Sequence, residues 1–374
     1  WEKIRVQLTE PLTARFFGTV AEWIRANIHT AGGSIPSPHC AVATVMWFMA
    51  RKYTRRGFVW LAPVIVSLYI STVYGRFHYL SDMVVGIAAA GFEAAPPILA
   101  MGGELKNTLC LLRPGQAILS QHLGDLEDAR TADEFERTLD LYRHLYQHEP
   151  VAIALDRHPD YRSTWVGRAL AAEQGIEVIA VQHHFAHLAS VMADAGWPLD
   201  GGQVVGLAFD GLGWGEDGSV WGGEFLLADY QGGERLGHLR PVPMPGGTRA
   251  IREPWRNLYA QIATCLGWQA FAANYPDLEL THFLAAKPRA TLATMMARGL
   301  NSPLTSSCGR LFDAVAAALG LCRDAIAYEG QAAIELETLA LGAATGEEGD
   351  AYPFGLDSAR GRWLLDPAPM WAAL

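Results

Sequence analysis

The sequence predicts an α/β domain over residues 93–374 that follows an all-α transmembrane fragment over residues 1–92. Segments of strand type alternate with segments of helix type in the rear part, which is the order of a layered α/β core. The front part instead holds long uncharged segments. Charge divides the chain at the same place. Residues 1–92 carry nine Lys/Arg and four Asp/Glu, a net of +5, whereas residues 93–374 carry twenty and thirty-five, a net of −15.

The front part contains one segment of membrane-spanning length. Residues 57–75 are 19 residues without a charge, close to the roughly 20 that cross a bilayer core as a helix. Residues 38–50 and 83–92 are apolar but shorter, and they fit either membrane segments or buried helices. Four basic residues within 51–56 are typical of a cytoplasmic loop. The pattern predicts contact with a membrane through residues 38–92.

This topology brings two histidine-bearing segments to the opposite membrane surface. His78 and Asp82 are four residues apart, so in a helix the carboxylate can orient the imidazole as a nucleophile. His39 can protonate the leaving oxygen, and Arg76 can hold phosphate oxygens. The segments PSPH and RFHYLSD resemble motifs of the membrane-bound type 2 phosphatidic acid phosphatase superfamily, which implies a lipid phosphatase. The alternative is a non-catalytic fusion remnant in which these histidines are interfacial residues.

The rear part begins at residues 92–97, because Pro96 and Pro97 interrupt any continuing helix. We expect two strands near 220–229 and 234–242 to form a hairpin, a mainly helical chain beyond residue 252, and a loosely ordered segment at the polar residues 346–363. The elements before the hairpin are predicted in the order strand 98–101, helix 132–147, strand 150–155, helix 163–174, strand 176–181, helix 184–195 and strand 203–209.

Three histidines lie within the segment VQHHFAHLAS, residues 181–190. His183 and His187 are four residues apart, a spacing that places two imidazoles on one helical face, where they can bind a divalent metal. Zinc proteases use the same spacing but need a glutamate beside the first histidine, and His184 occupies that position here. A protease is therefore excluded. Pairs with this spacing also occur on ordinary wet helix faces, so other residues must decide between the two interpretations.

A glycine-rich segment after a strand favours the metal interpretation. The strand QVVGLAFD ends in Asp210, and Gly211, Gly213 and Gly215 follow it. Such glycines leave backbone N–H groups open to a phosphate. A carboxylate beside them can hold a metal–nucleotide complex.

An earlier glycine turn follows the predicted strand 98–101. Gly102 and Gly103 form the turn, and Lys106 is a candidate phosphate contact. Two phosphate loops that each follow a strand favour the actin/hexokinase type of nucleotide-binding fold.

Nine segments occur in order across residues 95–340. They are MGGELKNTLCLL, SQHLGDLED, DRHPDYRSTWVG, VQHHFAHLAS, FDGLGWGEDGSVWGGEFLLAD, HLRPVPMPGG, IREPWR, residues 301–320 and YEGQAAIELE. Together they resemble the C-terminal part of the HypF family of hydrogenase-maturation carbamoyltransferases. The resemblance implies an actin-like carbamoyltransferase domain that uses ATP and carbamoyl phosphate to form a carbamoyl-adenylate. It also implies transfer of the carbamoyl group to the C-terminal cysteine of a partner maturase, HypE.

The resemblance assigns roles to the residues of the two glycine segments and the histidine pair. His183, His187 and Asp210 would hold a divalent metal, zinc or iron, with magnesium as a further candidate. Lys106 and the glycines after Asp210 would neutralise phosphate charge. His184 would have a supporting or structural role.

The family's late glycine-rich loop and its final Asp-Gly-Gly segment have no counterpart before Leu374. We therefore expect a domain that is incomplete at its C-terminus and binds metal and nucleotide weakly. Trp1 in place of a methionine likewise suggests that the start of the chain is absent.

Composition limits the remaining classes. The net charge of −15 over residues 93–374 argues against binding nucleic acid through its phosphates. The five cysteines, Cys40, Cys110, Cys265, Cys308 and Cys322, form no C-x-x-C pair and indicate a reducing compartment. We expect Cys308 to be a packing residue at a serine-capped helix start. The rear part would lie in the cytoplasm, tethered to the inner membrane by the front part.

Overall fold

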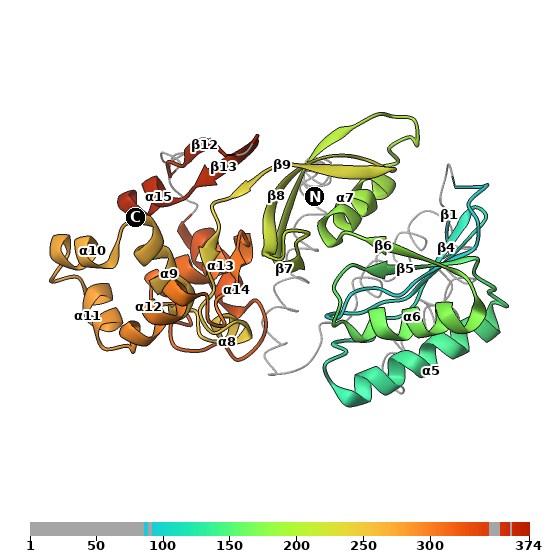
Figure 1. Ribbon diagram of the computed structural model, residues 1–374, viewed down its shortest axis with the longest axis horizontal. Coiled ribbons are helices and arrows are strands. Elements are labelled where there is room, and N and C mark those ends of the chain that lie inside the picture. The colour runs from blue at the N-terminus through green and yellow to red at the C-terminus, as the bar shows by residue number, and fades with distance from the viewer. Residues whose placement is uncertain (1–85, 89–91, 344–351, 360) are drawn as a thin grey trace, which may run out of the picture. The chain divides into compact units, whose positions relative to one another are not determined.

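The computed structural model describes residues 86–88, 92–343, 352–359 and 361–374, and element labels follow Figure 1. The chain divides into two units, residues 1–82 and 83–374. The phosphatase-like residues His39, Arg76, His78 and Asp82 and the expected spans at 38–50 and 57–75 lie outside the described residues. Within the described ranges, no helix is both long enough and apolar enough to cross a bilayer.

A six-stranded sheet with helices α5 and α6 against one face forms the first part of the second unit (Figure 1). The strand order is β1-β4-β3-β2-β5-β6. Strands β2, β5 and β6 are parallel, and β2, β3, β4 and β1 pair as antiparallel neighbours. The elements are β1 (Gly86–Ala88), β2 (Ile98–Ala100), β3 (Cys110–Arg113), β4 (Gln116–Leu119), α5 (Ala129–Leu145), β5 (Ala152–Asp156), α6 (Arg162–Gln174), β6 (Glu177–Val181) and α7 (His183–Asp194).

Apolar side chains from both layers form the core of this first part. Leu99, Ile153 and Leu155 on the strands pack in one buried cluster with Phe135 and Leu139 on α5. Helix α6 approaches the sheet closely at Gly167, since a Cβ there would lie 2.3 Å from Leu155 Cδ2. The strands of this sheet are mostly apolar, although β6 is largely exposed.

A second sheet follows, with strand order β10-β11-β8-β9-β13-β12 and with β7 paired to β8. Its long central hairpin is antiparallel, while β13 runs parallel to β9. The elements are β7 (Val204–Trp214), β8 (Val220–Asp229), β9 (Gly232–Leu239), β10 (Val242–Pro243), β11 (Leu304–Thr305), β12 (Gly355–Ala359) and β13 (Arg362–Asp366).

Short helices pack around α13 and α9 beside the second sheet (Figure 1). Their shared core contains Leu258 and Ile262 of α9, Leu284 of α11 and Leu311 of α13. The helices are α8 (Thr248–Arg252), α9 (Trp255–Cys265), α10 (Trp268–Asn274), α11 (Glu279–Ala285), α12 (Arg289–Arg298), α13 (Cys308–Ala318), α14 (Gln331–Ala343) and α15 (Ala368–Ala373).

The alternating order predicted for residues 98–209 is confirmed, with boundaries that shift by a few residues. Two expectations are wrong. Within 83–92, an expected helix, residues Gly86–Ala88 form β1 and pair antiparallel with β4, so the first sheet begins before the predicted boundary at 92–97. Within 346–363, β12 and β13 pair as a hairpin that joins the second sheet through β9. The hairpin β3–β4 was not predicted.

A buried ion pair fastens the central hairpin of the second sheet. Glu224 is fully buried, and its Oε2 accepts a hydrogen bond from Arg235 Nε at 2.6 Å. Its Oε1 accepts from Ser306 Oγ at 2.5 Å and from the backbone N–H of Gly222. The Arg235 guanidinium also lies 3.9 Å from the ring centroid of Trp221. Every charged group in this network has a partner, as burial requires.

Replacement of Glu224 by alanine should therefore be strongly destabilising. The change leaves the guanidinium of Arg235 buried without its main partner, which costs about 3–5 kcal/mol in comparable cases. Chemical denaturation of the two proteins measures the difference in the free energy of unfolding. Glu234→Ala, which removes an exposed carboxylate from the same hairpin, should change it by less than about 0.5 kcal/mol. Equal effects of the two substitutions would contradict this account.

Candidate functional site

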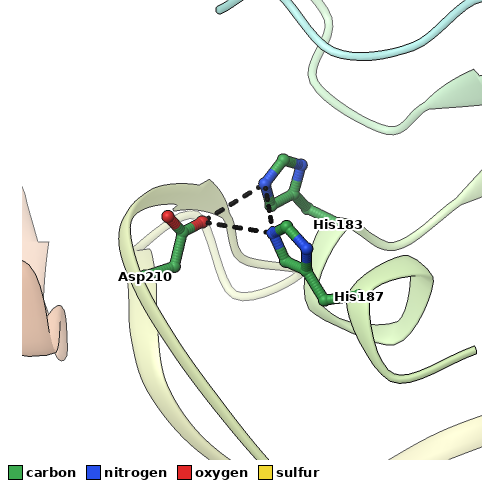
Figure 2. A group of neighbouring side chains, drawn as sticks. All are labelled: His183, His187 and Asp210. Atoms are coloured by element: carbon green, nitrogen blue, oxygen red, sulfur yellow. Dashed lines mark hydrogen bonds and ion pairs between the residues drawn. The ribbon is translucent and has the colours of Figure 1, made fainter. Parts of the chain in front are cut away.

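Three side chains converge at one end of α7 (Figure 2). His183 and His187 project from the helix toward Asp210 on β7. His183 Nε2 lies 3.2 Å from His187 Nε2 and 3.2 Å from Asp210 Oδ2, and His187 Nε2 lies 3.8 Å from the same oxygen. Ligand atoms around a tetrahedral zinc, at about 2.0–2.2 Å from the metal, are about 3.3–3.6 Å apart. The three predicted residues are thus brought together with separations that one cation could bridge.

Helix α7 places both histidines at its first two turns. The Gln182 side chain caps the helix, since its Oε1 accepts the backbone N–H of Phe185 at 2.9 Å. The cap sets the helix start at His183, and the four-residue spacing then puts His187 on the same face. His184, next to His183, is fully buried.

Asp210 lies in an irregularity of the β7–β8 ladder. The register shifts between Phe209 and Gly213, so that three residues of β7 stand opposite Gly222. A bulge of this kind redirects a side chain away from the regular pleat. A Cβ at Gly222 would lie 2.4 Å from the carbonyl oxygen of Asp210, so this close approach requires glycine.

The start of α13 fixes the backbone of Asp210 from the other side. Ser307 caps α13, and its hydroxyl lies 2.9 Å from the Asp210 carbonyl and 2.8 Å from that of Gly211. A Cβ at Gly309 would lie 2.9 Å from Gly211 Cα. Cys308 is buried beside this cap and acts as a packing residue, as predicted.

His183 has a second carboxylate partner. Its Nδ1 lies 2.7 Å from Asp156 Oδ2, at the end of β5. Burial alone would lower the pKa of His183, but the hydrogen bonds to Asp156 and Asp210 outweigh it and raise the pKa to about 9. Burial would likewise raise the pKa of Asp210, yet the facing imidazoles and the N–H of Gly211 lower it well below its usual range.

The pKa of His184 is shifted in the opposite direction to that of His183. Burial lowers the pKa of its ring to about 4, so the ring is neutral at pH 7. It fits against Gly213, where a Cβ would lie 2.2 Å from His184 Cε1. Its Nε2 lies 3.7 Å from Asp210 Oδ2. The ring therefore packs behind the carboxylate, in agreement with a supporting role.

A cavity of about 260 Å³ opens beside the histidine pair. Gly102 and Gly103 line one side, and His183 and His187 line another. The turn is shaped by Asn107, whose buried side-chain amide donates to the carbonyls of Met101 and Gly103. The first predicted glycine turn thus lies next to the histidine pair.

The other predicted phosphate contacts, the glycines after Asp210 and Lys106, already have partners within the protein. The N–H of Gly211 donates to the Asp210 carboxylate and that of Gly215 to the Ser219 carbonyl, so neither is open to an anion. Gly215 instead makes room for the indole of Trp221. Lys106 is exposed, with Nζ 3.7 Å from Glu329 Oε1. The glycines after Asp210 thus serve packing in this structure.

Two family models match this part of the chain. Residues 93–194 match the HypF Kae1-like domain, and residues 206–374 match the model described as carbamoyltransferase, Kae1-like domain, second subdomain. Residues 1–92 lie outside both matches, so the phosphatase resemblance of that part stays a prediction.

Curated HypF proteins are similar over the same region. Carbamoyltransferase HypF of Rhodobacter capsulatus is 47% identical over 284 residues, which are 76% of this chain and 36% of that protein. A carbamoyltransferase HypF homolog of Cupriavidus necator is 41% identical over 251 residues, 67% of this chain and 61% of that protein. Carbamoyltransferase HypF2 of the same organism is 44% identical, and the aligned region is 29% of its length. The chain therefore spans about a third of the length of several relatives.

The fold of HypF is also similar. A full-length HypF in a phosphate- and nucleotide-bound form has a TM-score of 0.65 at 33% identity, covering 75% of this chain and 34% of that one. HypF of T. kodakarensis has a TM-score of 0.62 at 28% identity, covering 77% and 37%. Both agree with the mixed α/β fold predicted for this region.

Sequence reasoning did not find Asp156, Ser307 or Gly309 as contributors to the site. Asp156 lies in the segment DRHPDY, which supported only the family resemblance. Its position at the end of a strand parallel and adjacent to β6 was the available signal, because β6 leads directly into His183.

Replacement of Gly213 by alanine should destabilise the chain by about 1–3 kcal/mol, the usual cost of overpacking a buried site. The new methyl group would overlap the His184 ring, which has no free space behind it because it is fully buried. Thermal denaturation measures the effect. Gly232→Ala is the matched control, since a Cβ at Gly232 meets no atom within 4 Å. A Gly213→Ala variant as stable as wild type would show that the close approach of Gly213 to the His184 ring is not needed.

Proposed function

We propose that residues 93–374 carry a metal-dependent carbamoyl-transfer site of the HypF type, which acts in the maturation of nickel–iron hydrogenases. The substrates would be ATP and carbamoyl phosphate, activated as a carbamoyl-adenylate. The acceptor would be the C-terminal cysteine of HypE. The observation that carries this proposal is the convergence of His183, His187 and Asp210 beside a glycine-lined cavity, in a domain similar to HypF.

The residues fit a divalent cation of the zinc or iron type. Two imidazole nitrogens and one carboxylate oxygen form a donor set that both metals accept. Asp210 Oδ2 is buried, and the polar atoms nearest to it are imidazole nitrogens, His183 Nε2 at 3.2 Å and His187 Nε2 at 3.8 Å. A cation there would neutralise this oxygen and, when bound, would polarise phosphate oxygens of the nucleotide. Zinc and iron remain alternatives, and magnesium is less suited to two imidazole ligands.

The protein's own groups would position the substrate. The turn at Gly102 and Gly103 lines the cavity next to His183, and Gly103 has no side chain that would stand between a phosphate and the backbone there. Lys106 extends from the same turn and adds a positive charge. The buried side chain of Leu155 also lines the cavity and excludes water at that point.

The transfer itself needs a thiolate from outside this region. Attack by the partner thiolate on the carbamoyl carbon forms a C–S bond and breaks the C–O bond to the adenylate phosphate, so that AMP leaves. Burial raises the pKa of each described cysteine, to about 11 for Cys110, Cys308 and Cys322 and about 12 for Cys265. These thiols are protonated at neutral pH and are poor nucleophiles. This property supports a partner cysteine as the acceptor.

A double substitution tests the proposed site directly. The wild-type chain, stripped with a chelator and reloaded, should bind about one equivalent of zinc or ferrous ion, and His183→Ala/His187→Ala should bind none at these residues. Elemental analysis and calorimetry provide the measurement. His144→Ala/His282→Ala, which removes two exposed helical histidines, is the matched control and should bind like wild type.

The same two double variants test the reaction. Mass spectrometry of HypE incubated with the chain, ATP and carbamoyl phosphate should detect a carbamoyl group on the C-terminal cysteine, absent with the first variant and present with the control. Metal binding that survives loss of both histidines, or transfer without them, would overturn the proposed function.

Metal affinity should depend on pH in a defined direction. The pKa of His183 is raised to about 9 in the metal-free protein, so the ring is mostly protonated at pH 7 and the metal must displace that proton. The dissociation constant should therefore fall about tenfold from pH 7 to pH 8 for one displaced proton, and it should level off above about pH 9. Calorimetry in two buffers counts the released protons. An affinity unchanged between pH 7 and pH 8 would contradict the protonation of His183.

A further inference from the structure

One buried carboxylate near the site is not among the three converging ligands. Asp156 ends strand β5, and its side chain is only 7% exposed. Its Oδ2 lies 2.7 Å from His183 Nδ1, on the side of the ring that faces away from His187 and Asp210. We propose that Asp156 is a positioning residue that holds His183 in the tautomer and orientation needed to bind the metal, an inference that rests on the proposed function.

The tautomer follows from the hydrogen bond. A carboxylate can only accept, so the proton of a neutral His183 ring must reside on Nδ1. The lone pair of Nε2 then points at the space shared with His187 Nε2 and Asp210 Oδ2. The negative charge behind the ring also increases its basicity and therefore its strength as a ligand.

Asp156 is itself held in one orientation. Its Oδ1 accepts the backbone N–H of His158 at 2.8 Å, and its carbonyl accepts the hydroxyl of Thr164 at 3.1 Å. The parallel pairing of β5 with β6 sets Asp156 opposite Val181, two residues before His183. The carboxylate is therefore carried by a short side chain on a hydrogen-bonded strand, which limits its movement relative to His183.

The two histidine ligands differ in this respect. The His187 side chain is 56% exposed, and no described residue makes a hydrogen bond to its Nδ1. Among the described residues, His183 is therefore held by a hydrogen bond on its Nδ1 side that His187 lacks. Loss of Asp156 would therefore leave the site without a fixed imidazole, although all three ligand residues would still be present.

A structural role for Asp156 is the competing interpretation, because its carboxylate also binds the loop at His158. Asp156→Asn separates the two. The amide oxygen can still accept the N–H of His158, but its NH₂ group then faces His183 Nδ1. That ring nitrogen would have to accept, which places the proton on Nε2 and blocks metal binding.

The test uses the full chain and cobalt(II) as a spectroscopic probe for the metal. Asp156→Asn should raise the cobalt dissociation constant about 10- to 100-fold, the range seen when such partners of metal-bound histidines are removed. Its visible cobalt bands should also change in intensity. Asp160→Asn removes an exposed carboxylate from the same loop and should leave affinity and bands within twofold of wild type. Thermal denaturation with a chelator present verifies that all three proteins are folded at the temperature of the binding measurement.

The outcomes separate this inference from the proposed function. If wild type binds cobalt through His183 and His187 but Asp156→Asn binds equally well, the positioning role is overturned and the proposed function stands. If wild type binds no metal, both are overturned. Should the variant not fold, nitrogen-15 NMR of the zinc-loaded wild-type chain decides. A proton on His183 Nδ1 supports the inference, and a proton on Nε2 overturns it.

Discussion

The site depends on the close approach of three electron-rich atoms that would repel one another without a positive charge between them. His183 Nε2 lies 3.2 Å from both His187 Nε2 and Asp210 Oδ2. If both rings are neutral and carry their protons on Nδ1, three lone pairs face the same point. A shared proton or a metal cation relieves that repulsion, and the raised pKa of His183 shows how strongly the arrangement attracts positive charge. The rest of the domain holds these atoms in place.

Two consecutive serines connect the site to the most buried charge pair of the second sheet. The Ser306 hydroxyl donates to Glu224, which is paired with Arg235. The Ser307 hydroxyl donates to the carbonyl oxygen of Asp210. Hydrogen bonds to Glu224 and to Asp210 therefore hold the segment that precedes α13. Displacing Glu224 would move Ser306. Because Ser307 follows directly, its hydrogen bond to the Asp210 carbonyl would be disturbed as well. Stability and site geometry share the same hydrogen bonds here, so substitutions in this network should affect both.

The features that sequence predicted were those encoded locally. The four-residue spacing of His183 and His187 determines a shared helical face, and the apolar segment before Asp210 determines a strand end. The features that it missed depend on pairing between distant residues. Trp363 in β13 pairs with Gly237 in β9 across more than a hundred residues, so a polar segment expected to be loose is held by a sheet. Likewise, glycines expected to bind phosphate serve to admit the rings of His184 and Trp221. A glycine pattern alone does not tell an anion loop from a packing contact.

The three candidate ligands come from two separate regions of sequence. His183 and His187 lie within the match to the first Kae1-like model, residues 93–194, and Asp210 lies within the match to the second, residues 206–374. Neither region contains the three ligands by itself. A bound cation would therefore stabilise the contact between α7 and β7, since any ligand that binds only the joined state favours that state by mass action. This coupling suggests a second role for the buried glycines around Asp210, besides packing. They keep the carboxylate within reach of the helix even before a metal binds, so less of the binding free energy is needed to bring the two regions together.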